Sequence, residues 1–357
     1  MSINAPKVSP SQAASMLLAH AISQLSDGKR HLPVYLWGTY GVGKSAIVKQ
    51  MITKLREHFD APIGLIDARL SQLDAVDTRG IPTIEDGLTS FALPAWLPYA
   101  HRDGDRGVLF LDEIQLGSQS VKAAAYQLLN ERRLGDYILP DGWTVVAASN
   151  RPNDGAGVSG RMDSAISTRF KYHLDVTPSA AETTDYFQDI GVRPEVIAFL
   201  KFRGEAVGDQ AGLIHEYPNG NTAKDKVAIA TPRTWESVSD ILDDGLPVDL
   251  EHIAIEGAIG AGAAGEFVAF LRTMRNLPDI GMFLSDPHNV PLPNEITTQY
   301  AVTAALAARV TADNLGNGVT VVSRINNELL EVFWILATRR DPDLKASPEY
   351  VAHKATY

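Results

Sequence analysis

The segment GTYGVGKS, at residues 38–45, constrains the fold of this 357-residue chain more than any other feature. It matches the pattern G-x-x-x-x-G-K-[ST] at every fixed position. The apolar run VYLW (34–37) precedes it, and the apolar positions of SAIVKQMITKLREHF (45–59) have helical spacing. A chance glycine-rich turn would need neither neighbour, whereas a strand, a glycine-rich loop and a helix N-terminus together bind phosphate. We therefore expect a phosphate cradle formed by consecutive residues, Gly38, Thr39, Tyr40, Gly41, Val42, Gly43, Lys44, Ser45 and Ala46.

Two acidic residues follow a second apolar run. VLFLDE (108–113) begins without alternation of apolar and polar residues, as expected of a strand buried on both faces, and ends in Asp112 and Glu113. The carboxyl ends of parallel strands gather at one edge of a sheet, where ligands bind. In such a site Lys44 would reach the β- and γ-phosphates, and Ser45 and Asp112 would hold Mg²⁺. Glu113 would orient or deprotonate the attacking water.

Asn150 ends a further apolar run, WTVVAASN (143–150). At the same edge of the sheet its amide would contact the γ-phosphate or the attacking water. An ordinary turn asparagine before Arg151 and Pro152 explains the residue equally well. The residues alone therefore leave both interpretations open.

The alternation of short apolar runs and helical segments predicts an α/β fold. It indicates a parallel five-stranded sheet that is covered on both sides. The expected strands are 34–37, 64–70, 108–112, 143–150 and 171–176, with helices at 9–27, 45–59 and 118–131. After Pro178 the pattern is helical, and the segment 204–232 is expected to be a long loop. The helices expected in this second domain are 180–203, 233–243, 251–275, 296–312 and 323–337.

The amino-acid composition limits the kinds of metal site and binding partner that we expect. The chain has no cysteine, which excludes disulfides and cysteine-bound zinc or iron–sulfur clusters. Its nine histidines form no HExxH motif, so Mg²⁺ is the metal that we expect. The net charge of −11 disfavours tight, sequence-independent binding of nucleic acid, which needs clustered lysine and arginine. No apolar run approaches the about 20 residues that span a bilayer, and the N-terminus lacks the layout of a signal peptide. We expect a cytoplasmic protein without membrane insertion.

Taken in order, the motifs resemble those of AAA+ ATPases. GTYGVGKS matches Walker A, LFLDE (109–113) matches Walker B, and Asn150 stands at the sensor 1 position. STRF (167–170) resembles the arginine-finger motif, and TPRTWE (231–236) resembles sensor 2. The resemblance implies ATP hydrolysis with Mg²⁺ in a homo-oligomeric ring, usually a hexamer, with ATP at the subunit interfaces.

The resemblance also implies roles for two arginines. Arg169 would be the finger that acts on a neighbouring subunit's ATP, and Arg233 would be the sensor 2 residue. From the residues alone, Arg169 could instead form a surface ion pair, and Arg161 is a competing finger. Arg233 could be no more than a helix-start arginine after Pro232.

Within the AAA+ proteins the chain most resembles the MoxR-like, dynein-related branch. Three stretches carry this likeness: LSQLDAVDTRGIP…ALPAWLP (70–98), LLNERRLGDYILPDGWTVVAASNRP (128–152) and GAGVSGRMDSAISTRF (155–170). The implied organisation is an ATPase core over 1–176, a helical lid domain over 177–284 and a helical C-terminal extension over 285–357. Two hairpins would be inserted in the core, at about 80–95 and 133–143. Their expected turns are Glu85-Asp86-Gly87 and Pro140-Asp141-Gly142.

Relatives in this branch are associated with von Willebrand A-type partners, which implies a motor that remodels or activates a protein target. Two other functions stay open. A nucleic-acid-directed AAA+ ATPase, such as a loader or strand-opening motor, is disfavoured by the acidic balance. A nucleotide-gated scaffold with negligible turnover is disfavoured by the presence of Lys44, Asp112, Glu113 and Asn150.

Overall fold

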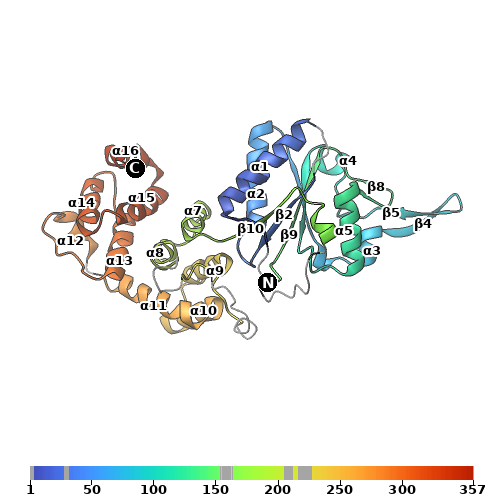
Figure 1. Cartoon of the computed structure of the whole chain (residues 1–357). Coiled ribbons are helices and arrows are strands. Elements are labelled where there is room, and N and C mark those ends of the chain that lie inside the picture. The colour runs from blue at the N-terminus through green and yellow to red at the C-terminus, as the bar shows by residue number, and fades with distance from the viewer. Residues whose placement is uncertain are drawn as a thin grey trace. The chain divides into compact units, whose positions relative to one another are not determined.

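The computed structural model describes residues 4–27, 32–152, 154, 162, 164–204, 212–215, 227–277 and 279–356. Among these residues, a first compact unit ends at Pro178 and a second begins at Ser179 (Figure 1). Helices in the described ranges are all too short or too polar to cross a lipid bilayer.

The first unit is built on a parallel sheet with the strand order β1-β10-β2-β9-β6-β3. The expectation of a parallel α/β sheet is confirmed, but the sheet has six strands rather than five. The additional strand, β1, is only two residues long, too short for any periodicity, and it pairs with β10 at the edge of the sheet. The strands are β1 (Lys7–Val8), β2 (Val34–Gly38), β3 (Gly64–Arg69), β6 (Gly107–Asp112), β9 (Trp143–Ser149) and β10 (Tyr172–Val176).

Helices cover both faces of this sheet (Figure 1). The helices α1 (Pro10–Asp27) and α2 (Lys44–Phe59) share a core with Val34 and Leu36 of β2. The helix α5 (Gln119–Glu131) shares a second core with Tyr35 and Trp37 of the same strand. Successive side chains of a strand point to opposite faces. Both faces of β2 are therefore apolar, which explains why its sequence does not alternate.

Two antiparallel hairpins interrupt the core. The strands β4 (Ile81–Glu85) and β5 (Leu88–Ala92) are joined by Asp86 and Gly87, which both have positive φ, at 51° and 75°. Such a two-residue turn matches the twist of the strands that it connects.

The second hairpin, β7 (Arg133–Leu134) and β8 (Tyr137–Ile138), turns at Gly135, whose φ is 57°. The expected turn at Pro140-Asp141-Gly142 was wrong. Those residues form a turn that leads into β9, closed by the bond from the Trp143 N–H to the Pro140 carbonyl. The shorter elements of the unit are η1 (Leu70–Gln72), α3 (Ala75–Arg79), α4 (Ala100–Asp103) and α6 (Ser164–Ser167).

The second unit is helical in its described part, as expected. The predicted helices 180–203 and 251–275 are each two helices, divided at Gly191 and Gly260, where φ is 88° and 82°. Glycine adopts this left-handed conformation without strain and ends helices for that reason. The helices are α7 (Ala180–Ile190), α8 (Pro194–Arg203), α9 (Pro232–Asp243), α10 (Val248–Ile259), α11 (Ala261–Arg275), α12 (Ile280–Ser285), α13 (Ile296–Ala307), α14 (Leu315–Ile325), α15 (Leu329–Arg340), η3 (Pro342–Ala346) and α16 (Pro348–Thr356).

The predicted helix 323–337 also spans a boundary, because the chain leaves α14 at Asn326 and begins α15 at Leu329. One continuous apolar core joins these helices, with Phe199, Trp235 and Phe267 in mutual ring contact. The division into a lid over 177–284 and an extension over 285–357 stays a prediction. Most of the expected loop 204–232 lies outside the described residues.

Candidate active site

The loop between β2 and α2 has the backbone of a phosphate cradle. Gly41 and Gly43 have φ values of 72° and 92°, in the left-handed region where a side chain would be strained. A Cβ at Gly38 would lie 2.9 Å from Val42 Cγ1 and 3.2 Å from the Val176 carbonyl oxygen. The 16-residue helix α2 begins directly after Gly43 and has no side-chain cap. Its N-terminus therefore faces the loop with the N–H groups that bind anions.

Lys44 places a buried ammonium group at the centre of this loop. Its Nζ donates to the carbonyl oxygens of Gly38 and Thr39, at 2.8 and 3.0 Å, and to Asn150 Oδ1 at 2.9 Å. The side chain is 8% exposed, and a buried charge of this kind needs such partners. Because β2 and β9 are neighbours in the sheet, Asn150 reaches the loop directly from the end of β9. This contact favours a site residue over an ordinary turn asparagine.

Ser45 and Asp112 meet across the same edge of the sheet. The Ser45 hydroxyl donates to Asp112 Oδ2 at 3.3 Å. Neither here nor at any other place among the described residues do three or more His, Asp or Glu side chains form a group arranged to hold a metal. Mg²⁺ commonly takes only one or two protein oxygens and completes its shell with phosphate and water. The Ser45–Asp112 pair fits that pattern of ligands.

Glu113 is held in an unusual position beside this pair. Its φ is 55°, in the left-handed region that non-glycine residues rarely adopt. Its N–H donates to Asp112 Oδ1 at 2.8 Å, and its Oε2 accepts a hydrogen bond from the Ser71 hydroxyl. Such strain often accompanies a functional site. The carboxylate is therefore oriented by a residue that lies 42 positions earlier in the chain.

Ser71 was not identified from the sequence. It lies in η1, directly after β3, and β3 pairs with β6 so that Arg69 stands opposite Asp112. Only the strand order reveals that the residues after β3 adjoin those after β6. The same pairing brings a third acid, Asp67, to this side of the site, beside Asp112 and Glu113. Burial raises the pKa of the Asp67 carboxyl, and the nearby Asp112 raises it further.

A buried ion pair anchors the end of β9. Arg151 Nε lies 2.6 Å from Asp175 Oδ1, and Arg151 also donates to the Val176 carbonyl at 3.2 Å. Both acceptors belong to the end of β10. The pair therefore fixes the chain immediately after Asn150, although nothing in the local sequence marks it.

The two arginines singled out by the resemblance, the predicted finger Arg169 and the predicted sensor 2 residue Arg233, belong to different units. Arg169 follows α6, and its Nη1 lies 3.5 Å from the Tyr126 carbonyl of α5, which packs on the face opposite α2. Arg169 makes no ion pair with another described residue, and its role as the finger stays a prediction. Arg233 lies exposed in the first turn of α9, in the second unit, where Thr231 and Thr234 form the helix cap. Arg161 lies outside the described residues.

Comparison with known proteins adds little to this geometry. Neither a family model nor a curated protein matches the chain. Among solved structures, the Thermotoga maritima RuvB Holliday junction branch migration motor is 18% identical, with 86% of this chain and 84% of that chain covered and a TM-score of 0.39. An S. cerevisiae Hsp104–ADP complex is 16% identical, with 56% and 42% covered and a TM-score of 0.40. Likeness at these levels carries no argument about function. The assignment of the site therefore depends on the contacts described above.

Proposed function

We propose that the chain is an ATP-hydrolysing AAA+ ring motor of the MoxR type that remodels or activates a protein target. The observation that supports hydrolysis best is the convergence of four side chains at the N-terminus of α2. Lys44 contacts Asn150, and Ser45 contacts Asp112; these residues lie at or after the carboxyl ends of β2, β6 and β9. A loop that merely bound phosphate would need Lys44 and none of the other three.

Each residue then has a distinct role in ATP hydrolysis. Lys44 and the loop N–H groups bind the phosphates, and Asn150 orients the γ-phosphate or the water. Ser45 and Asp112 would hold Mg²⁺, which when bound offsets the negative charge of the phosphate oxygens. Glu113 accepts a proton from the attacking water once the Ser71 hydroxyl no longer holds its carboxylate. Arg169 acts on the ATP of the neighbouring subunit, and Arg233 is the sensor 2 residue.

Binding and turnover should separate between two variants. Lys44→Ala should lose tight ATP binding, because the phosphate-facing cation is gone. Glu113→Gln should bind ATP normally and lose about 10²–10⁴-fold in turnover, because the base is gone and the shape is kept. Titration with a fluorescent ATP analogue and a phosphate-release assay measure the two quantities. Hydrolysis by Glu113→Gln at the wild-type rate would contradict the role of Glu113.

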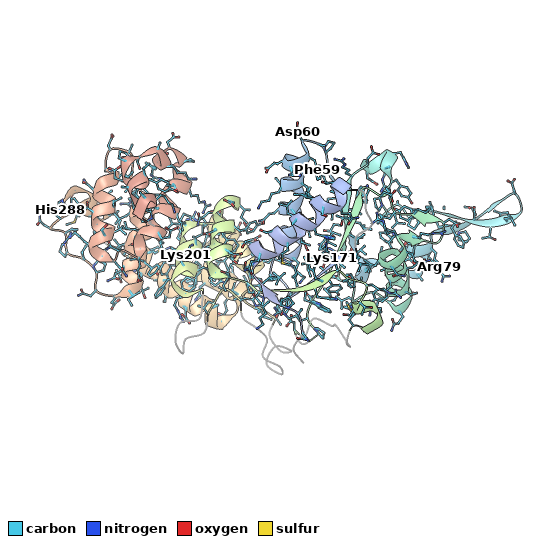
Figure 2. All side chains as sticks on the ribbon, turned by 45° about the horizontal axis from the view of Figure 1, so that its top comes forward. Phe59, Asp60, Arg79, Lys171, Lys201 and His288 are labelled. Carbon is cyan, nitrogen blue, oxygen red and sulfur yellow. The ribbon has the colours of Figure 1, made fainter. Side chains whose placement is uncertain are left out.

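The surface of the β4–β5 hairpin supports a protein target over a nucleic acid. Ile81, Ile84 and Leu88 are 65%, 83% and 73% exposed. In Figure 2 the hairpin projects beyond Arg79, with no other element covering its side chains. The chain has no lysine or arginine between Arg79 and Arg102. Exposed apolar residues without basic neighbours suit an apolar recess on a protein and give no attraction to a phosphate backbone.

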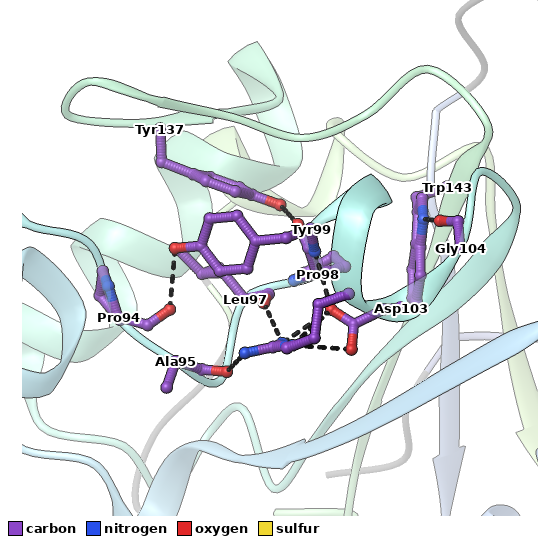
Figure 3. A network of polar contacts seen from close by, with 10 residues as sticks. Pro94, Ala95, Leu97, Pro98, Tyr99, Asp103, Gly104, Tyr137 and Trp143 are labelled. Carbon is purple, nitrogen blue, oxygen red and sulfur yellow. Dashed lines mark hydrogen bonds and ion pairs between the residues drawn. The ribbon is translucent and has the colours of Figure 1, made fainter.

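A polar network fastens the base of this hairpin to the second one (Figure 3). Tyr137 of β8 donates to the Pro98 carbonyl at 2.5 Å, and its ring contacts Tyr99 edge to face at 5.5 Å. Arg102 donates to the Ala95 and Leu97 carbonyls, both at 2.8 Å. The chain after β5 is therefore tied to β8. Both hairpins can then move together when a partner binds.

The von Willebrand A-type partner is proposed from the resemblance and needs a direct test. Glu113→Gln protein should accumulate ATP-bound rings with the partner attached, and a pull-down would recover it. The nucleic-acid alternative makes a different prediction: DNA or RNA would stimulate the ATPase, and added salt would abolish the stimulation. Stimulation of that kind would replace the protein-remodelling proposal.

A further inference from the structure

Four aromatic side chains form a cluster on the α5 face of the sheet. Tyr35 and Trp37 come from β2, Phe170 precedes β10, and His173 belongs to β10. The Tyr35 ring contacts those of Trp37, Phe170 and His173 at centroid distances of 4.5, 4.9 and 5.3 Å. These contacts bury apolar area. His173 also forms hydrogen bonds at its ring nitrogens, which apolar packing alone would not require.

His173 uses both ring nitrogens. Trp37 Nε1 lies 3.2 Å from His173 Nδ1, and His173 Nε2 lies 2.9 Å from the Ser167 carbonyl oxygen. An indole N–H can only donate, so Nδ1 must accept. The ring proton is then on Nε2, which donates to Ser167. A neutral imidazole thus adds a side-chain link between the end of β2 and the turn after α6, beside the backbone pairing of β10 with β2.

The two linked segments belong to different parts of the proposed reaction. Trp37 directly precedes Gly38, the first residue of the phosphate loop. Ser167 ends α6, where the Arg169 N–H bonds the Ile166 carbonyl at 3.0 Å and the Phe170 N–H bonds the Ser167 carbonyl at 3.4 Å. The Ser167 carbonyl is therefore part of the turn that presents Arg169. His173 ties this turn to the strand that enters the subunit's own phosphate loop.

We propose that His173 is a positioning residue for Arg169, holding the finger turn in register with the β2 strand so that the guanidinium reaches the neighbouring subunit's ATP. The proposal rests on the trans role of Arg169 given above. A positioning role makes a different prediction from a simple packing role. Loss of the two hydrogen bonds should impair Arg169, which acts on the neighbouring subunit's ATP, and should leave the phosphate loop of the same subunit intact.

Three variants of one subunit separate these possibilities. His173→Phe keeps the ring and the volume but loses both hydrogen bonds, and should lower kcat by up to about 10²-fold with little change in the KM for ATP. His173→Gln retains an N–H that can reach Ser167, and should keep most of kcat. His58→Phe, at an exposed histidine of α2, is the matched control and should match the wild type. Equal losses in His173→Phe and His173→Gln would overturn the proposal.

Mixed rings locate the defect. Two differently tagged variants are co-expressed, and complexes that carry both tags are purified. The reference is Arg169→Ala with Lys44→Ala, in which some interfaces join an intact phosphate loop to an intact finger. His173→Phe with Lys44→Ala should recover as much activity as this reference. His173→Phe with Arg169→Ala should not recover, because neither subunit presents a well-placed finger.

Every other pattern counts against the proposal. Recovery with Arg169→Ala alone would place the defect in the phosphate loop, and recovery in both pairings or in neither would exclude an effect specific to the finger. Full activity of Arg169→Ala by itself would instead remove the trans role on which the inference rests. If His173→Phe does not assemble, Trp37→Phe, which removes the donor to Nδ1 and keeps an aromatic ring, goes through the same pairings with the same expectations.

Discussion

The phosphate loop and the β4–β5 hairpin belong to the same unit but are built in opposite ways. Lys44 is buried, and its ammonium group contacts three oxygens of the protein. The hairpin instead exposes Ile84 and Leu88 to solvent, at 83% and 73%. A site that handles the same small ligand in every cycle gains from a fixed geometry. A surface that meets another macromolecule keeps its apolar residues outside the core.

The two regions are nevertheless linked through a short stretch of chain. Ser71 bonds Glu113 at the site, and α3 follows it and leads into β4. Trp96, just after β5, donates to the Asp77 carbonyl of α3 at 2.9 Å. A displacement of the hairpin would therefore pull on the segment that carries Ser71. The following predictions test how far the two regions are separate and how far they are coupled.

The largest effect is expected at Arg169. Arg169→Ala should bind ATP nearly as the wild type does and lose about 10³–10⁵-fold in turnover, as expected for a trans-acting arginine. Steady-state phosphate release across a range of protein concentrations measures this. Wild-type activity should rise with concentration as rings assemble. Turnover that is independent of concentration, or full activity of the variant, would contradict a site shared between subunits.

Apolar residues of the two regions should differ strongly in what they contribute to stability. Ile47→Ala, in the core beneath the phosphate loop, should lower the free energy of unfolding by about 2–5 kcal/mol. Ile84→Ser, at the hairpin, should change it by less than about 0.5 kcal/mol, because its side chain is already in water. Denaturant unfolding of the two variants gives both numbers. A large loss from Ile84→Ser would mean that the hairpin packs against the protein in solution.

The hairpin should matter for the partner and not for basal hydrolysis. The double variant Ile84→Ser, Leu88→Ser should keep the wild-type basal ATPase and oligomeric state, and should lose partner binding by about tenfold or more for two buried apolar contacts. The matched control is Leu250→Ser, Ile253→Ser, which removes two apolar residues of similar exposure from α10 in the second unit. Equal partner binding by wild type and both double variants would leave the hairpin without its proposed role.

Features that depend on residues close together in the chain could be predicted from the sequence, and features that depend on contacts between distant residues could not. The loop around Gly43 and Lys44 was predictable, because one local motif specifies its strand, turn and helix. Asn150 and Glu113 were predictable as residues at strand ends, because parallel strands share an edge. Ser71 and the Arg151–Asp175 pair were not predictable, because their partners are set by strand order across the sheet. The breaks at Gly191 and Gly260 were missed because the apolar spacing continues through both glycines.

The smallest effect is expected at Ser71, and it tests the coupling directly. A net hydrogen bond contributes about 1 kcal/mol, so releasing Glu113 from Ser71 should change the basal rate by only about fivefold. Ser71→Ala should raise basal turnover, because the carboxylate is then free to reach the attacking water, and should reduce any further stimulation by the partner. Ser71→Thr, which keeps the hydroxyl, should behave as the wild type. Phosphate release with and without partner measures both effects. If Ser71 merely supports Glu113 in its active position, Ser71→Ala would lower the basal rate instead, and the hairpin would have no means of acting on the site through this bond.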